Sequence, residues 1–187
     1  MSIFVVDTNV PIIANGSEPH ASLQCRLHCV ERISRLIKSD IIAIDDGYAI
    51  ILEYRTYLKS TGQPGVGDAF LRWILTNYAN PRRCHRVKIT PVRSARLYKE
   101  FPLDAGLKAF DPSDRKFVAV SIAHKKHPII LEAIDRGWWI HRTALGAHSV
   151  EVCFLCEREI RSAAALHPRR GKKRLTTLRR GRKSRAS

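Results

Sequence analysis

The strings FVVDTNV (residues 4–10) and PIILEAIDRGW (residues 128–138) decide the fold class, because each places an acid after a short apolar run. The first run closes on Asp7 and the second on Asp135. Short apolar runs bounded by polar residues are typical of buried strands. If both are parallel strands of one sheet, their carboxylates emerge at its carboxyl edge, where open α/β sheets bind ligands. We therefore expect a catalytic metal site at that edge.

The segments between these strings alternate between strand and helix patterns. Strands are predicted over residues 3–6, 41–44, 86–89, 128–134 and 150–155, and helices over 23–39, 47–59, 67–78, 94–100, from 112 onward and over 157–166. Alternation at this spacing predicts an α/β fold around a parallel sheet.

Length and composition set further limits. A chain of 187 residues with 44% hydrophobic residues is long enough for one α/β domain with an appendage. No segment has the roughly 18 consecutive apolar residues of a membrane span. The first predicted strand starts at residue 3, which leaves no room for a secretory leader. We therefore expect a cytoplasmic protein with no membrane association.

Positive charge is concentrated at the C-terminus. The chain has 33 Lys and Arg against 17 Asp and Glu, a formal net charge of +16. Ten of these basic residues and no acid lie in residues 168–187, which leaves 23 basic against 17 acidic residues, or +6, elsewhere. With almost nothing apolar to bury, this tail is predicted to be disordered. It is suited to binding phosphate backbones. The alternative is a solubilising extension or an antitoxin-like contact strip.

The five cysteines do not have the spacing of an obvious disulfide framework. Cys153 and Cys156 have the spacing of half a zinc site, but in a strand residues three apart point to opposite faces. Cys25 and Cys29 lie four apart on a predicted helix and can share one face. No second ligand pair completes a zinc site, so reduced, buried thiols are favoured over structural zinc.

Four carboxylates stand out as candidate ligands, although each has a purely structural alternative. In this alternative, Asp7 does no more than cap the next helix. Asp114 does no more than interact favourably with a helix dipole, and Asp135 does no more than start a turn. Glu53 is harder to explain in that way, since it shares a mostly apolar stripe of its predicted helix, where an unpaired acid is costly. Oxygen-only ligation favours Mg²⁺ or Mn²⁺ over zinc.

The order FVVDTNV, LEY, DPSDRKFVAVSIA and IILEAIDRGWW resembles the PIN-domain ribonucleases, including VapC-type toxins. The resemblance spans roughly residues 1–155. It implies a three-layer α/β/α fold around a parallel sheet of about five strands. It also implies that Asp7, Glu53, Asp114 and Asp135 are the four catalytic, metal-binding acids, with Asn9 orienting the first.

This resemblance implies a metal-dependent endoribonuclease that uses Mg²⁺ or Mn²⁺, with a nuclease domain over residues 1–157 and a C-terminal helix and basic tail over 158–187. RNA is the expected substrate, and an antitoxin protein or a second copy of the chain are further expected partners. Ala133 and Ile134 depart from the pattern, because the family often has Ser or Thr before its fourth acid. The residues expected to contact the RNA backbone are Arg115, Lys116, Arg136, Arg169, Arg170, Lys172, Lys173, Arg174, Arg179 and Arg180.

Other functions remain as alternatives. The main one is a catalytically idle PIN-like module tethered to RNA by its tail. A haloacid-dehalogenase-type phosphatase needs an acid two residues after the first, where this chain has Asn9. A flap-type DNA nuclease fits the fold, but this chain shows neither the further acids nor the arch-like insert that would support it.

Overall fold

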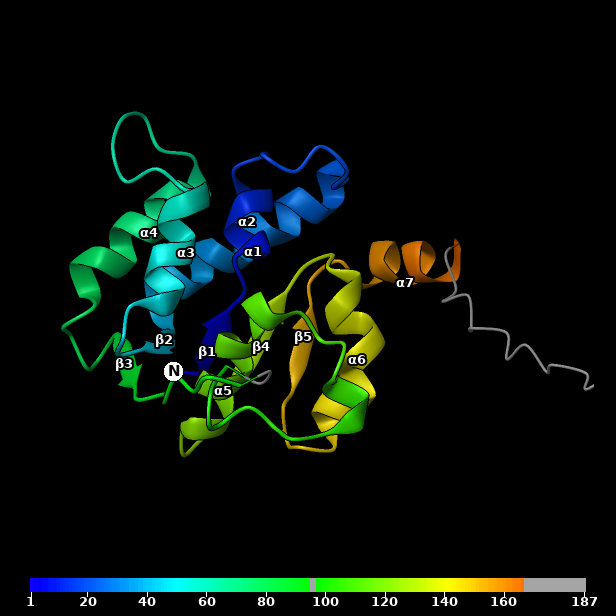
Figure 1. The fold of residues 1–187 in the computed structure, drawn as a ribbon. Helices are drawn as coiled ribbons and strands as arrows, with labels where there is room; N and C mark the ends of the chain where they lie inside the picture. Colours follow the sequence, from blue (N-terminus) through cyan, green and yellow to red (C-terminus); the bar gives the residue numbers. More distant parts are fainter. Residues whose placement is uncertain (95–96, 167–187) are drawn as a thin grey trace, which may run out of the picture.

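A five-stranded, all-parallel sheet forms the centre of the protein (Figure 1). The computed structural model describes residues 1–94 and 97–166, the last four of them by their backbone only. The strands are β1 (Ile3–Val6), β2 (Ile41–Asp45), β3 (Cys84–Val87), β4 (Ile129–Glu132) and β5 (Val152–Phe154), in the spatial order β3-β2-β1-β4-β5. The predicted α/β class and parallel sheet are confirmed.

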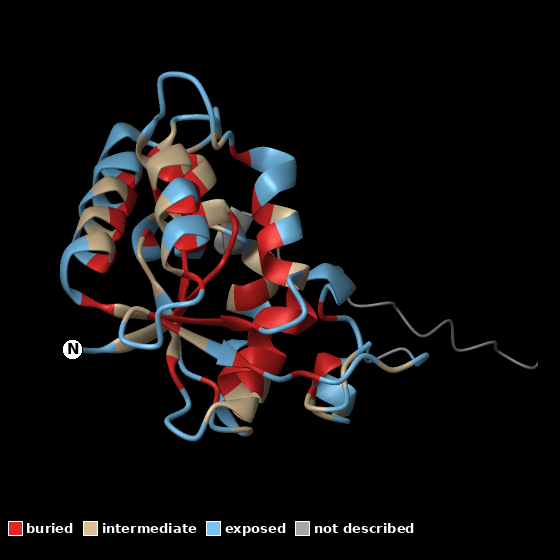
Figure 2. Cartoon of the chain, turned by 90° about the vertical axis from the view of Figure 1, so that its left-hand side faces the viewer, coloured by how far each residue is buried: buried red, intermediate tan, exposed pale blue. Residues whose placement is uncertain are grey.

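Helices cover both faces of this sheet. They are α1 (Asn9–Ala14), α2 (Leu23–Ser39), α3 (Ala49–Tyr57), α4 (Val66–Asn77), α5 (Arg115–Ala123), α6 (Arg136–Gly146) and α7 (Glu157–Leu166), with short 3₁₀ turns at Ala105–Leu107 and Pro112–Asp114. Helices α1, α2 and α4 pack on one another, and α5 packs on β1, β2 and β4. The rule that parallel crossovers are right-handed puts α1–α4 on one face and α5 and α6 on the other. Figure 2 shows the buried residues gathered on the strands and on the inward sides of the helices.

The longest helix, α2, shows why local sequence sets the elements. Its buried side chains are Cys25, Cys29, Ile33 and Leu36, which recur at the three- and four-residue spacing of one helix face. The Ser22 hydroxyl caps the helix by accepting the Cys25 N–H at 3.1 Å. Both ends of this helix were predicted correctly from the sequence.

The helix predicted over residues 94–100 is wrong. Pro91 and Tyr98 instead form an antiparallel bridge, and the Val92 N–H donates to the Leu97 carbonyl at 2.8 Å. Leu97 has a φ of 63°, which a helix does not allow. The conformation of so short a segment depends on its contacts with other parts of the chain more than on its helix propensity.

Helix α6 was not predicted from the sequence. Asp135 is its N-cap, and its buried face carries Trp138, His141 and Leu145. Trp138 is fully buried and packs edge-to-face on Phe110, as expected of a core residue. The aspartate that was assigned to a turn or a metal site therefore also starts a helix.

Within the described residues, no helix is long and apolar enough to cross a membrane. The predicted basic tail lies outside those residues.

Candidate metal centre

Two buried acids meet where the order of the sheet reverses. Asp7 follows β1 and Glu132 ends β4, and the register pairs Val6 with Leu131. The Asp7 N–H donates to the Leu131 carbonyl at 2.9 Å, so Asp7 and Glu132 lie side by side at the carboxyl edge. Asp7 is 4% exposed and Glu132 is fully buried. Such a reversal point is where doubly wound sheets bind ligands.

Asn9 joins these two acids. Its backbone N–H donates to Asp7 Oδ1 at 2.9 Å, and its side-chain amide donates to Glu132 Oε1. Its own side-chain oxygen accepts the Ala133 N–H at 3.1 Å. The resemblance implied that Asn9 orients Asp7. In the structure only the Asn9 backbone contacts Asp7, whereas its side chain holds Glu132, which the sequence did not indicate.

Asp114 and Asp135 lie close to this pair. Asp114 ends the 3₁₀ turn before α5 and is 9% exposed. Asp135 is exposed, its Oδ1 accepts the Gly137 N–H at 2.5 Å, and its own N–H donates to Glu132 Oε1 at 2.8 Å. The aspartate predicted as the fourth ligand is thus held beside the buried glutamate by the helix that it caps.

Glu53 reaches the site from α3 with both carboxylate oxygens engaged. Oε1 accepts the Thr8 hydroxyl at 2.5 Å, and Oε2 forms an ion pair with Lys116. The Lys116 ammonium also donates to the Ser113 carbonyl. This pairing explains how an acid on an apolar stripe is accommodated, since burying it unpaired would be costly.

The mutual repulsion of these acids appears in their pKa values. Burial, followed by the charges of Asp114 and Glu132, raises the pKa of Asp7 well above its usual value. Burial and then Asp135 raise the pKa of Asp114 to about 7. Burial raises the pKa of Glu132 to about 8, although hydrogen bonds from Asp135 and Asn9 oppose this. The site therefore holds negative charge only at a cost in free energy.

Glu132 is the site residue that sequence reasoning missed. It follows the apolar run at residues 129–131 directly, in the same relation that Asp7 has to residues 3–6. That parallel is the signal for Glu132 in the sequence, whereas the PIN pattern indicates Asp135. The structure places both residues at the site, with Glu132 buried and Asp135 exposed.

The predicted basic contacts divide into buried and more accessible residues. Arg115 is 5% exposed, and its guanidinium donates to the Phe110 carbonyl at 2.7 Å. Lys116 is 6% exposed and pairs with Glu53. Neither is the surface cation that was expected, because the first turn of α5 faces inward. Arg136, at the start of α6, is half-buried.

The donor set fits a hard divalent cation in its chemistry. All candidate ligands are carboxylates, and Glu132 Oε2 is buried without a hydrogen-bond partner among the described residues. A buried, unpartnered carboxylate oxygen is costly unless a cation or water meets it. Within the described residues, however, only a group of cysteines brings three ligand atoms within 4.8 Å of one another. Side-chain rotation is needed to close the carboxylates around an ion.

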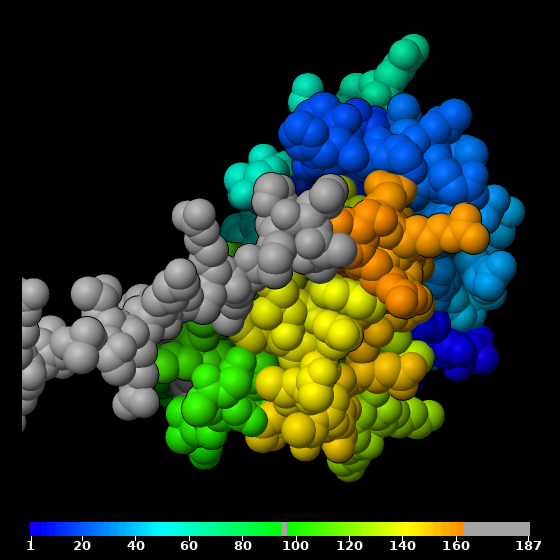
Figure 3. Space-filling view, turned by 90° about the vertical axis from the view of Figure 1, so that its right-hand side faces the viewer, coloured from blue at the N-terminus to red at the C-terminus, as the bar shows by residue number. Residues whose placement is uncertain are grey.

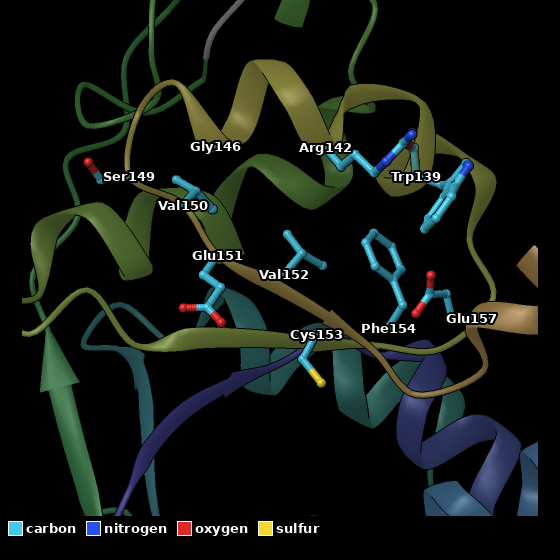
Figure 4. Close-up of a pocket in the computed structure, with 10 residues that line it drawn as sticks. All are labelled: Trp139, Arg142, Gly146, Ser149, Val150, Glu151, Val152, Cys153, Phe154 and Glu157. Atoms are coloured by element: carbon cyan, nitrogen blue, oxygen red, sulfur yellow. The ribbon is translucent and has the colours of Figure 1, made fainter. Parts of the chain in front are cut away.

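A depression of about 770 Å³ lies elsewhere, between α6 and β5. Figure 4 shows Trp139, Arg142 and Phe154 along it, and the Arg142 guanidinium stacks 4.0 Å from the centre of the Trp139 ring. Neither Asp7, Asp114 nor Glu132 lines it. The buried acids, and not this hollow, therefore mark the candidate site.

Comparisons of the chain with family models, with curated proteins and with solved structures give no match. The chemistry of the site therefore has to be inferred from its own residues.

Proposed function

We propose that the chain is a PIN-type, metal-dependent endoribonuclease that hydrolyses RNA phosphodiester bonds with Mg²⁺ or Mn²⁺. The observation that carries this proposal is the buried pair Asp7 and Glu132, joined by Asn9 at the reversal point of the sheet, with Asp114 beside it. Acids gathered at this cost are accounted for by a cation that they bind together.

Each residue has a distinct role in this proposal. Asp7, Glu132 and Asp114 hold the cation, and Asp135 adds charge at the exposed rim. Asn9 fixes the orientation of Asp7 and Glu132. When bound, Mg²⁺ or Mn²⁺ would acidify water and neutralise charge on the phosphate. No nucleophilic side chain is needed.

Lys116 gives Glu53 a separate role. Its ammonium holds one oxygen of Glu53, and Thr8 holds the other. Glu53 is therefore engaged within the protein and joins the ligands only if Lys116 turns away. We assign Glu53 to the outer edge of the site, where it positions Lys116 and Thr8.

RNA is the proposed substrate because of charge. The net charge of +16 suits a polyanion, and Arg136 stands next to the exposed Asp135 at the rim. A toxin role, with an antitoxin covering the site, and a homodimer are finer proposals that rest on the PIN resemblance. A cytoplasmic location is a further proposal.

The second candidate is a catalytically idle RNA-binding module. One observation favours it: Lys116 already supplies a positive charge inside the acidic group. A lysine ammonium can neutralise a carboxylate without any metal. The two functions differ in one respect: the nuclease needs Asp7 and Glu132 to cleave RNA, whereas the idle module does not.

Cleavage of labelled single-stranded RNA by the purified full-length chain distinguishes them. Wild type is compared in Mn²⁺, in Mg²⁺ and in EDTA with Asp7→Asn and Glu132→Gln. The matched control is Asp46→Asn, which removes an exposed charge at the same sheet edge. Cleavage that requires metal, Asp7 and Glu132 but not Asp46 supports the nuclease. RNA that is bound equally by all variants and never cut supports the idle module.

A further inference from the structure

Three cysteine side chains converge where α2 meets the segment between β5 and α7. Cys25 and Cys29 lie one turn apart on the buried face of α2, and Cys156 lies between β5 and α7. Cys25 and Cys156 form a disulfide across 131 residues, whereas Cys29 is a free thiol. All three sulfur atoms lie within 4.8 Å of one another, and all three residues are buried. The expectation of reduced thiols was therefore wrong for Cys25 and Cys156, because packing of distant segments brings them together.

The position of Cys29 goes beyond what a disulfide requires. A disulfide uses two sulfur atoms, and a buried cysteine that only fills space needs no sulfur neighbours. Here the Cys29 sulfur lies within 4.8 Å of the other two and shares a helix face with Cys25. Once the disulfide is reduced, these residues present three thiols around one point.

We propose that the reduced Cys25, Cys29 and Cys156 bind one thiophilic metal ion of the zinc group. The disulfide and the metal complex are then two mutually exclusive states of one site. Its ligands differ from those of the proposed Mg²⁺ or Mn²⁺ centre, and soft thiolates and hard carboxylates select different ions. It does not depend on the proposed nuclease activity.

The geometry fits three thiolate ligands. Zinc–sulfur bonds of about 2.3 Å place ligand sulfurs roughly 3.8 Å apart. All three sulfurs lie within 4.8 Å of one another, and reduction has to let the bonded Cys25 and Cys156 sulfurs separate to that distance. Closed structural zinc sites have four protein ligands, and no fourth His, Cys, Asp or Glu joins this group in the described part of the chain. The fourth position is left to water or an external ligand.

Nearby charge favours a cation at this point. Burial, followed by the negative charges of Glu132 and Glu159, raises the pKa of the Cys29 thiol to about 12. The two carboxylates that disfavour a thiolate there also lower the energy of a positive ion. A bound metal reverses the effect on the thiol, since it displaces the proton.

A surface pocket reaches two of the three cysteines. A pocket of about 430 Å³ is lined by Cys25 and Cys156 together with His28 and Leu155. On this side of the molecule, the first residues of α7 (orange) lie between the blue α2 region and the yellow α6 (Figure 3). Glu159 of α7 accepts hydrogen bonds from Ser22, and the fully buried Ile160 anchors the helix. The metal, like the disulfide, would fasten the start of α7 to α2.

The two states interconvert by a balanced reaction. A small dithiol such as dithiothreitol reduces the disulfide, and its own two sulfurs become a cyclic disulfide. Cys25 and Cys156 each gain one electron and one proton. Binding of the ion then releases the thiol protons.

The test is titration of the reduced, reductant-free full chain with Cd²⁺ under nitrogen, followed through the ultraviolet thiolate-to-metal charge-transfer band. The variant Cys29→Ser removes the third sulfur and leaves the disulfide able to form, so melting of its oxidised form verifies the fold. The matched controls are Cys84→Ser and Cys153→Ser, which change the other two free cysteines. Zn²⁺ competition confirms that both ions use one site.

We expect a band that saturates at about one equivalent in reduced wild type and in both controls, and affinity at least about 10-fold weaker in Cys29→Ser. Oxidised wild type should give no band. A reduced wild type without a band, or a Cys29→Ser protein that binds as wild type does, overturns the proposal.

Discussion

The metal-free protein should lose stability as pH rises, because folding forces acids together. Asp114 is 9% exposed, and its pKa is raised from 3.8 to about 7. An acid whose pKa is higher in the folded than in the unfolded state contributes its full stabilisation at pH values below the pKa of the unfolded state. This stabilisation is lost as the pH rises through the pKa of the folded state. The loss should therefore begin near pH 4 and be complete above about pH 7.

The magnitude follows from the size of the shift. A change of about three pKa units corresponds to about 4 kcal/mol at roughly 1.4 kcal/mol per unit. About two thirds of this, or about 3 kcal/mol, falls between about pH 5 and pH 8.5. Glu132, with a pKa of about 8, acts in the same direction. The two losses do not simply add, because neighbouring acids titrate together.

Urea unfolding at these two pH values, in EDTA and in Mn²⁺, measures this effect. In EDTA the free energy of unfolding should be about 3 kcal/mol lower at the higher pH, and Mn²⁺ should restore much of it by binding the native state. Asp7→Asn removes one of the repelling charges, so its metal-free form should be about 1–3 kcal/mol more stable than wild type at the higher pH. Mn²⁺ should then stabilise it far less.

Asp46→Asn is the matched control, since Asp46 is exposed and directly follows β2. It should behave as wild type in both buffers. A metal-free wild type whose stability is flat or rises with pH would refute the reasoning. Equal effects of the substitutions at Asp7 and Asp46 would also refute it, because general surface charge would then explain the result.

Three further predictions concern single contacts. Glu132→Gln should lower RNA cleavage at least about 100-fold in initial-rate assays with near-wild-type melting; unchanged rates would remove Glu132 from the ligand set. Lys116→Met, which leaves Glu53 without its ion-pair partner, should lower the free energy of urea unfolding by about 1–3 kcal/mol, and an unchanged midpoint would contradict that pairing. Reduction of the Cys25–Cys156 disulfide, which spans 131 residues, should cost about 2–5 kcal/mol by urea unfolding, whereas unchanged stability would mean that the bond does not restrain the chain.

The local sequence pattern predicted most of the helices and strands, but it gave the correct bounds for only some of them. The bounds of β1, α2 and α7 follow from short apolar runs and one-sided helical spacing, which depend on neighbouring residues alone. The prediction for β3 began two residues late, since Cys84 and His85 join the strand only by pairing with β2. Helix 136–146 was missed because its buried face is made by packing on distant segments, including Phe110.

The candidate site divides in the same way. The sequence alone determined that Asp7 and Asp114 stand at the ends of elements and that Asn9 follows the first strand, because these are local relations. Only the tertiary structure decided that Glu132 lies beside Asp7, since this depends on β4 pairing with β1 in one register. It also decided that Lys116 turns inward to Glu53 and that Cys156 meets Cys25. Contacts between residues far apart in the chain exist only after the strands have paired and α7 has packed back on α2, and no local pattern encodes that order.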